Sequence, residues 1–114
     1  INLELKENKI SIIETEAFYD LKNLRHLRLD KNLINIFNSS YIINIRDLDL
    51  SFNQIELLKI SSLSNLKFIY DINLDSNRIV DLDFNWQLDI ESILRILAMS
   101  NNRLENIKQN YFKN

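Results

Sequence analysis

The chain has 114 residues, of which 46% are hydrophobic and 26% charged, and its formal net charge is −2. This balance suits one folded domain and does not favour nucleic acid as a partner. Cysteine is absent, which excludes disulfide bonds, cysteine zinc sites and thiol chemistry, and the absence of glycine excludes glycine-rich phosphate-binding loops. No apolar run approaches the roughly 20 residues of a membrane-spanning helix, so direct membrane insertion is not expected.

The dominant feature is an apolar frame that recurs around five asparagines: Asn8, Asn32, Asn53, Asn77 and Asn102. They are separated by 24, 21, 24 and 25 residues. The frame is clear in Leu24-x-x-Leu27-x-Leu29-x-x-Asn32-x-Ile34 and returns as Ile45-x-x-Leu48-x-Leu50-x-x-Asn53-x-Ile55. Self-similarity at a period of this length indicates a stack of structural repeats.

Just before each Asn, apolar and polar residues alternate, which predicts a short strand with its apolar side chains on one face. One repeat cannot bury that face alone, so stacking must pair the strands into a parallel sheet with one continuous core. We therefore expect an α/β-type repeat solenoid with a parallel sheet on its concave face and mostly irregular or short helical arcs on its convex face. The five expected repeats are about 1–23, 24–44, 45–68, 69–93 and 94–114.

Each of the five asparagines stands where a strand ends and the chain must turn. An amide side chain carries donors and an acceptor, so we expect these residues to satisfy buried backbone groups as a structural ladder from repeat to repeat. Tight turns commonly use Gly or Pro, and both are absent. Because Asn tolerates left-handed backbone best among the other residues, we expect Asn to occupy these corners.

The segments that return from one strand to the next carry further apolar residues. Phe18 in the first repeat and Phe112 in the last stand at the same offset from their asparagines, and we expect them to plug the inner side of the convex arc. Segment 83–93 fits the spacing least. We expect it to form an irregular or partly helical arc, with Trp86 packed beneath it.

The full frame, Leu-x-x-Leu-x-Leu-x-x-Asn-x-Leu-x-x-Leu-x-x-x-x-Phe-x-x-Leu, resembles the typical leucine-rich repeat of animal extracellular proteins. This class is found in Toll-like receptors, Slit-like proteins and insect immune proteins. Residues 47–55 and 13–18 carry the resemblance most closely, and it covers nearly the whole chain. It implies a recognition scaffold whose activity depends on the surface residues displayed. Such arrays are usually flanked by cysteine-rich caps, so we expect a fragment of a longer array, with further repeats or another chain covering its ends.

The outward residues of the strands, six, four and two positions before each Asn, form the candidate binding surface. From the second to fourth repeats we select His26, Arg28, Asp30, Asp47, Asp49, Asp71, Asn73 and Asp75. Basic residues dominate the second repeat and aspartates the next two, a dipole that would steer a complementary protein partner. The alternative is a merely solvated face. Tyr70 is a candidate aromatic anchor, whereas Phe52 is expected to pack beside the ladder.

Catalysis is not expected. His26 is the only histidine, and although Asp49 and Ser51 fall on the next strand, an open sheet supplies neither an oxyanion site nor exclusion of water. Four aspartates could suggest Ca²⁺, but a flat sheet lacks the wrapped loop that gathers six or more ligands. No metal or cofactor is therefore predicted.

Asn38-Ser39-Ser40 is a glycosylation sequon, expected on the outer arc of the second repeat. Together with the resemblance it favours an extracellular or cell-surface location, in a receptor ectodomain or a secreted recognition protein. The alternative is a cytoplasmic leucine-rich-repeat adaptor or scaffold, which the absence of cysteine permits.

Overall fold

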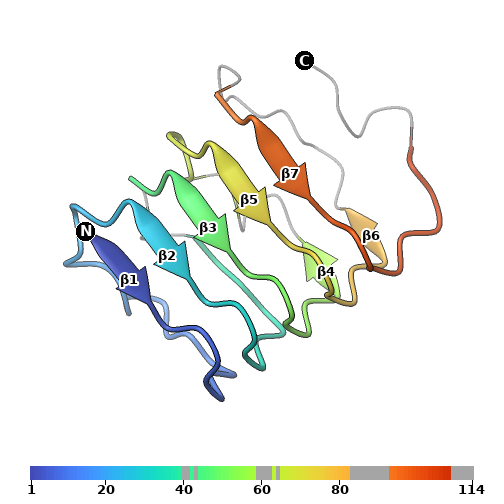
Figure 1. Ribbon diagram of the computed structural model, residues 1–114, viewed down its shortest axis with the longest axis horizontal. Helices are drawn as coiled ribbons and strands as arrows, with labels where there is room; N and C mark the ends of the chain where they lie inside the picture. Colours follow the sequence, from blue (N-terminus) through green and yellow to red (C-terminus); the bar gives the residue numbers. More distant parts are fainter. Residues whose placement is uncertain (40–41, 43, 59–62, 64, 83–92, 109–114) are drawn as a thin grey trace.

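The computed structural model describes residues 1–39, 42, 44–58, 63, 65–82 and 93–108. Its main sheet has five parallel strands in the order β1-β2-β3-β5-β7 (Figure 1). They are β1 (Asn2–Glu4), β2 (His26–Arg28), β3 (Asp47–Asp49), β5 (Asp71–Asn73) and β7 (Ile96–Ala98). Each lies in the alternating stretch before one ladder Asn, and the expected parallel-sheet solenoid is confirmed.

The five strands pair in one constant register, which aligns equivalent positions of successive repeats. The first row across the sheet is Asn2, His26, Asp47, Asp71 and Ile96. The third row is Glu4, Arg28, Asp49, Asn73 and Ala98. Between them runs an inward row of leucines and one isoleucine, so the polar rows face away from the core.

Two further strands, β4 (Leu57–Leu58) and β6 (Asp81–Leu82), pair in parallel in a second sheet. Elsewhere the described parts of the returning segments are turns and irregular chain, without helix. This agrees with the expected irregular arcs. The expectations for Trp86 and Phe112, and for 83–93 apart from Ile93, fall outside the described residues.

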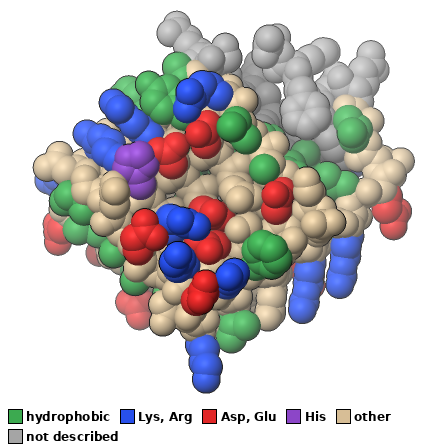
Figure 2. All heavy atoms as spheres, in the orientation of Figure 1, with side chains coloured by type: hydrophobic (Ala, Val, Ile, Leu, Met, Phe, Trp, Pro, Cys, Tyr) green, Lys and Arg blue, Asp and Glu red, His purple; other side chains and the backbone are tan. Residues whose placement is uncertain are grey.

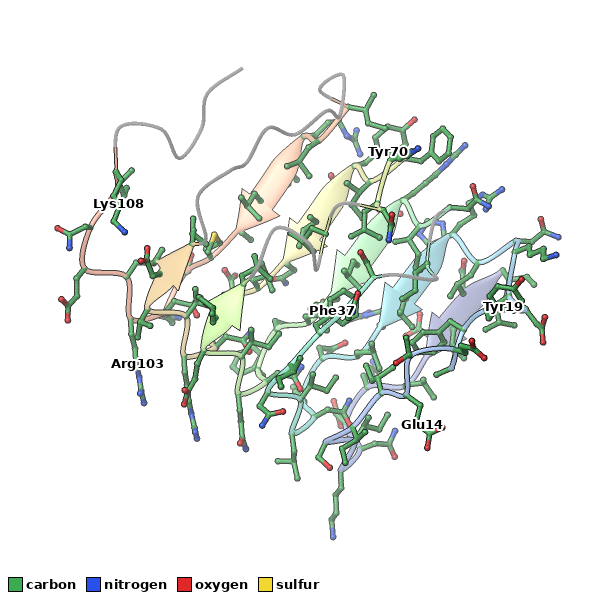
Figure 3. All side chains as sticks on the ribbon, turned by 180° about the vertical axis from the view of Figure 1, so that it is seen from behind. Glu14, Tyr19, Phe37, Tyr70, Arg103 and Lys108 are labelled. Atoms are coloured by element: carbon green, nitrogen blue, oxygen red, sulfur yellow. The ribbon has the colours of Figure 1, made fainter. Side chains whose placement is uncertain are left out.

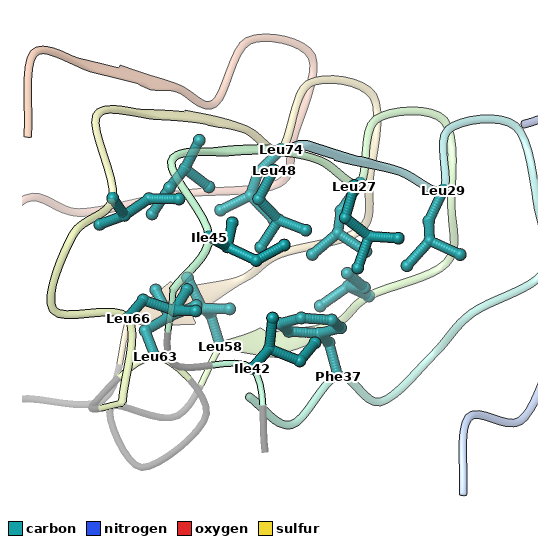
Figure 4. Packing of buried hydrophobic residues seen from close by; sticks show 14 of the residues in the cluster. Leu27, Leu29, Phe37, Ile42, Ile45, Leu48, Leu58, Leu63, Leu66 and Leu74 are labelled. Atoms are coloured by element: carbon teal, nitrogen blue, oxygen red, sulfur yellow. The ribbon is translucent and has the colours of Figure 1, made fainter. Parts of the chain in front are cut away.

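The core lies between the main sheet and the returning segments. Leu27, Leu29, Ile34, Ile45 and Leu50 are fully buried beneath the sheet. On the opposite side the buried side chains, shown in Figure 4, include Phe37, Ile42, Leu58, Leu63 and Leu66. Burying one such side chain stabilises the fold by roughly 1.5–3 kcal/mol, so the merged core is the main favourable term. Phe18 packs against this core only in part, because its repeat is the first of the stack.

The five asparagines form a hydrogen-bond ladder along the strand ends. Asn53 is representative. Its amide nitrogen donates to the carbonyls of Leu50 and Ser51 in its own repeat and of Leu29 in the preceding one, at 3.0–3.2 Å. Its Oδ1 accepts the N–H of Ile34 from the preceding repeat at 3.0 Å. Asn32, Asn77 and Asn102 repeat the same pattern.

Left-handed backbone occurs at the residue before each ladder Asn. The five residues, with φ between 54° and 56°, are Glu7, Lys31, Phe52, Ser76 and Asn101. The expectation that Asn takes these corners is therefore wrong at four of five positions. Left-handed backbone costs a non-glycine residue roughly 1–2 kcal/mol. The first four offset that cost by donating their N–H to a carbonyl of the next repeat, a bond that any residue type can make.

The position of Phe52 in this turn also changes the expectation that it packs beside the ladder. Phe52 leaves 56% of its surface exposed. It stands at the tip of the turn, where its backbone bonds to Asp75 of the next repeat while its ring is only partly covered. The ring of Phe52 therefore packs only in part against neighbouring residues.

We expect Asn53→Ala to lower the free energy of unfolding by about 2–4 kcal/mol, because several buried backbone groups would each lose a partner at roughly 1–3 kcal/mol. Chemical denaturation of the chain followed by circular dichroism measures this change. Gln54→Ala is the matched control, since it removes an amide side chain one residue later and keeps the backbone bond from Gln54 to Ile34. An equal loss in both variants would contradict the ladder's role.

Candidate functional site

The outward side chains of all five main strands line a shallow hollow of about 380 Å³. Its position on the open side of the main sheet makes this the concave face of the solenoid. Alternation along each strand places these side chains here, while the intervening leucines enter the core. All eight residues selected from the sequence lie on or beside this face.

Arg28 is enclosed by carboxylates from three successive repeats. Its Nε lies 3.3 Å from Asp30 and 3.9 Å from Glu4, and its Nη2 lies 3.7 Å from Asp49. The expected basic character of the second repeat is therefore largely offset within the chain. The concave face is acidic over its centre, and the predicted dipole along the stack is reduced.

Two more side-chain contacts join neighbouring repeats on the same face. The Nδ1 of His26 lies 2.5 Å from Asp47, and Arg95 lies 3.4 Å from Asp71. The hydroxyl of Ser51 is buried and donates to Asp49 at 2.6 Å. Since that hydroxyl is engaged with its own strand and not with His26, the arrangement does not build a Ser-His-Asp relay.

Some of the eight candidate residues also accept hydrogen bonds from the backbone. Asn73 accepts the N–H of Asp75, and Asp75 accepts the N–H of Ser100 from the next repeat at 2.6 Å. Asp30 is only 6% exposed and lies against Arg28. The side chains of His26, Arg28 and Asp47 are the more accessible members, with 46%, 42% and 37% of their surface exposed.

Sequence reasoning named Tyr70 as a candidate anchor but missed the row of residues just before the strands to which it belongs. One equivalent position, immediately before each of β2, β3, β5 and β7, is occupied by Arg25, Arg46, Tyr70 and Arg95. The guanidiniums of Arg46 and Arg95 lie 5.7 and 5.2 Å from the centre of the Tyr70 ring. Counting seven residues back from each ladder Asn would have revealed this row.

Ion pairs also link successive repeats beyond the ends of the main strands. Lys31 Nζ lies 3.0 Å from Glu7 Oε1, and Lys108 lies 2.9 Å from Asp81. The hydrogen bond and positive charge of Lys31 hold the pKa of Glu7 below its ordinary value. Solvent screens such exposed pairs, so they add little to stability.

Within the described residues, no three His, Asp or Glu side chains converge in a metal-binding group. That same part of the chain has no helix with the length and apolar character needed to cross a bilayer.

The chain is similar in sequence to several known proteins. The family model described as leucine rich repeat matches residues 1–34. Human leucine-rich repeat-containing protein 36 is 33% identical over 90 residues, which are 77% of this chain and 12% of that protein. Bovine asporin is 34% identical over 88 residues, 75% of this chain and 24% of asporin. Mouse Toll-like receptor 9 is 28% identical over 117 residues, 98% of this chain and 11% of the receptor.

A solved structure shows the same architecture. The crystal structure of the TLR13–ssRNA13 complex superposes with a TM-score of 0.85 and 26% identity, covering 96% of this chain and 16% of that chain. This chain thus spans less than a quarter of the length of the curated relatives named above. The recurring Asn frame, the parallel sheet and these similarities agree: the chain is a leucine-rich repeat protein, and its repeats resemble the typical class.

Proposed function

We propose that this chain recognises a protein partner through its concave face, as an ectodomain segment of a receptor or of a secreted recognition protein. The observation that carries the proposal is the hollow lined by all five main strands. Its charged side chains are already fixed by ion pairs and backbone hydrogen bonds. A surface ordered before binding loses less conformational entropy on association, which favours affinity.

The chemistry of the face indicates the kind of partner. Its outward rows contain Glu4 and five aspartates, set against Lys6, Arg28 and His26. At the β7 end the face becomes apolar, with Ile96 exposed and Ala98 beside it. A protein with basic side chains next to an apolar anchor would complement both parts.

The similar solved structure named above is a complex with RNA. The acidic centre of this concave face would repel a phosphate backbone, which supports a protein partner here instead of nucleic acid. The open face also gives no support to a catalytic role, because reacting groups on it would stay in contact with water.

The proposal includes further repeats, or another chain, packed against the two ends of the sheet. Leu3 and Leu5 at β1, and Leu97 and Met99 at β7, pack against the core but are only partly buried. A neighbouring repeat on each side would complete their burial, as the stack does for Leu48 and Ile72 in its middle.

Charge reversal tests the concave face. The chain is immobilised, a protein partner is isolated from the extracellular fluid of the source organism, and the Kd of the purified partner is measured for each variant. We expect Asp47→Lys to weaken binding by about tenfold or more, as for central charged contacts in protein interfaces. Glu14→Lys is the matched control, with the same charge change on the outer side of the solenoid (Figure 3).

Thermal unfolding of both variants shows whether the fold is retained. Equal affinity of wild type and Asp47→Lys, or a greater loss in Glu14→Lys, would exclude the concave face as the binding surface.

Glycosylation distinguishes the extracellular proposal from the cytoplasmic adaptor. Asn38 is exposed on the returning segment of the second repeat, so a glycan can be accommodated there. We expect peptide mapping of the protein from its native source to find a glycan on Asn38 that an amidase removes. An unmodified Asn38 in the native protein would favour the adaptor, because the cytosol does not carry out this modification.

A further inference from the structure

A second surface lies at the edge where the main strands begin. We define the edge row as Arg25, Arg46, Tyr70 and Arg95. The N–H of Arg46 donates to the carbonyl of Arg25, that of Tyr70 to Arg46, and that of Arg95 to Tyr70, each at 2.7 Å. The sheet's hydrogen bonding thus continues beyond the strands, so members of the row follow one another at roughly the 4.8 Å strand spacing.

The side chains of the edge row are held in place mainly by an aromatic ring and by backbone carbonyls. The guanidiniums of Arg46 and Arg95 flank the ring of Tyr70, which provides a π-face for each cation. Arg25 donates to the carbonyls of Lys22, Leu24 and Asn44, at 3.3–3.5 Å. Carbonyl groups fix a guanidinium but leave its charge in place.

Carboxylates offset only part of this charge. Arg95 pairs with Asp71 at 3.4 Å. No carboxylate among the described residues lies within ion-pair distance of Arg25 or Arg46. The exposed Lys22 and Lys67 stand three residues before row members. Figure 2 shows Lys and Arg side chains along this edge, and Asp and Glu side chains together with other basic side chains nearer the middle of the face.

The geometry favours an extended peptide over a nucleic acid. Guanidinium groups bind carboxylates through two parallel hydrogen bonds. Three intervals of the row span ~14 Å, and alternate side chains of an extended peptide recur every ~6.8 Å, so three acidic side chains fit the same length. Sequence-tolerant binding of single-stranded nucleic acid relies on aromatic faces for base stacking, and guanidiniums already flank the Tyr70 ring.

We propose that the edge row binds an extended acidic segment of a protein partner, which runs across the strand starts and pairs alternate carboxylates with Arg25, Arg46 and Arg95. The acidic concave centre beside the row repels such a segment and so confines it to the edge. This site is separate from the concave surface proposed above, and either can hold if the other fails.

Fluorescence anisotropy with a labelled peptide of five Glu-Thr repeats tests the proposal, with five Gln-Thr repeats as the neutral peptide. We expect the chain to bind the acidic peptide in preference to the neutral one, and increasingly weakly as salt is added. The double variant Arg25→Gln/Arg46→Gln should weaken binding by about tenfold or more, since it removes two charged hydrogen-bonding groups.

The matched control is Arg78→Gln/Arg103→Gln. It removes the same charge from exposed positions just after the ladder, and Arg103 lies at the edge of the sheet opposite Tyr70 (Figure 3). We expect this control to leave the Kd within about twofold, because surface charges act weakly beyond the Debye length. Tyr70→Leu keeps the net charge and should still weaken binding several-fold. The guanidiniums of Arg46 and Arg95 would lose the aromatic ring that holds them in place.

Melting temperatures of all variants show that the fold is retained. An equal loss in the two double variants would overturn the proposal in favour of unspecific charge attraction. A single-stranded DNA decamer that binds more tightly than the acidic peptide and displaces it would overturn it in favour of nucleic acid. Asp47→Lys should not weaken peptide binding, which separates this site from the concave one.

Discussion

The structure depends on one interaction, the hydrogen bonding of an asparagine amide at the end of each main strand, which is buried in the three inner repeats. The side chain of Asn53 joins three carbonyls and one N–H drawn from two repeats. Leaving such groups buried and unpaired would cost roughly 1–3 kcal/mol each, so no apolar residue can replace the amide. Residues such as Phe52 and Lys31 can adopt left-handed backbone because the ladder hydrogen bonds fix the turn in which they lie. A chain without glycine can therefore make five tight corners.

The same constraint arranges the surface chemistry. Every repeat begins its turn at the same distance from its ladder Asn. Equivalent outward side chains of successive repeats therefore align in rows across the sheet. Two rows carry the acidic centre around Asp47 and Asp49, and the edge row carries the guanidiniums around Tyr70. The charges are thus separated across the sheet, from strand start to strand centre, more than along the stack. A partner that contacts the solenoid meets two neighbouring surfaces of opposite sign, and both are fixed in position by the register of one ladder.

The strands, their parallel pairing and the ladder positions could be predicted from the sequence. The alternation of apolar and polar residues and the recurring Asn indicate directly which side chains point into the core. The corner residues could not, because Glu7 or Ser76 gives no compositional sign of positive φ; their geometry follows from bonds to the next repeat. The neutralisation of the Arg28 charge could not be predicted from the sequence either. It depends on how far the long Arg28 side chain reaches towards Glu4, Asp30 and Asp49, and residue spacing alone does not determine that reach. The edge row escaped notice because it lies one residue outside the strands, although its seven-residue offset from each Asn was present in the sequence.

Native-state hydrogen exchange tests the central claim most directly. The N–H groups of Ile34 and Ile55 donate to the Oδ1 atoms of Asn53 and Asn77, inside the stack. If the ladder unites the repeats, both amides exchange only through global unfolding, with the free energy found by chemical denaturation. Exchange of these two amides by local opening, while the amides of the β2 and β3 strands stay protected, would contradict the account.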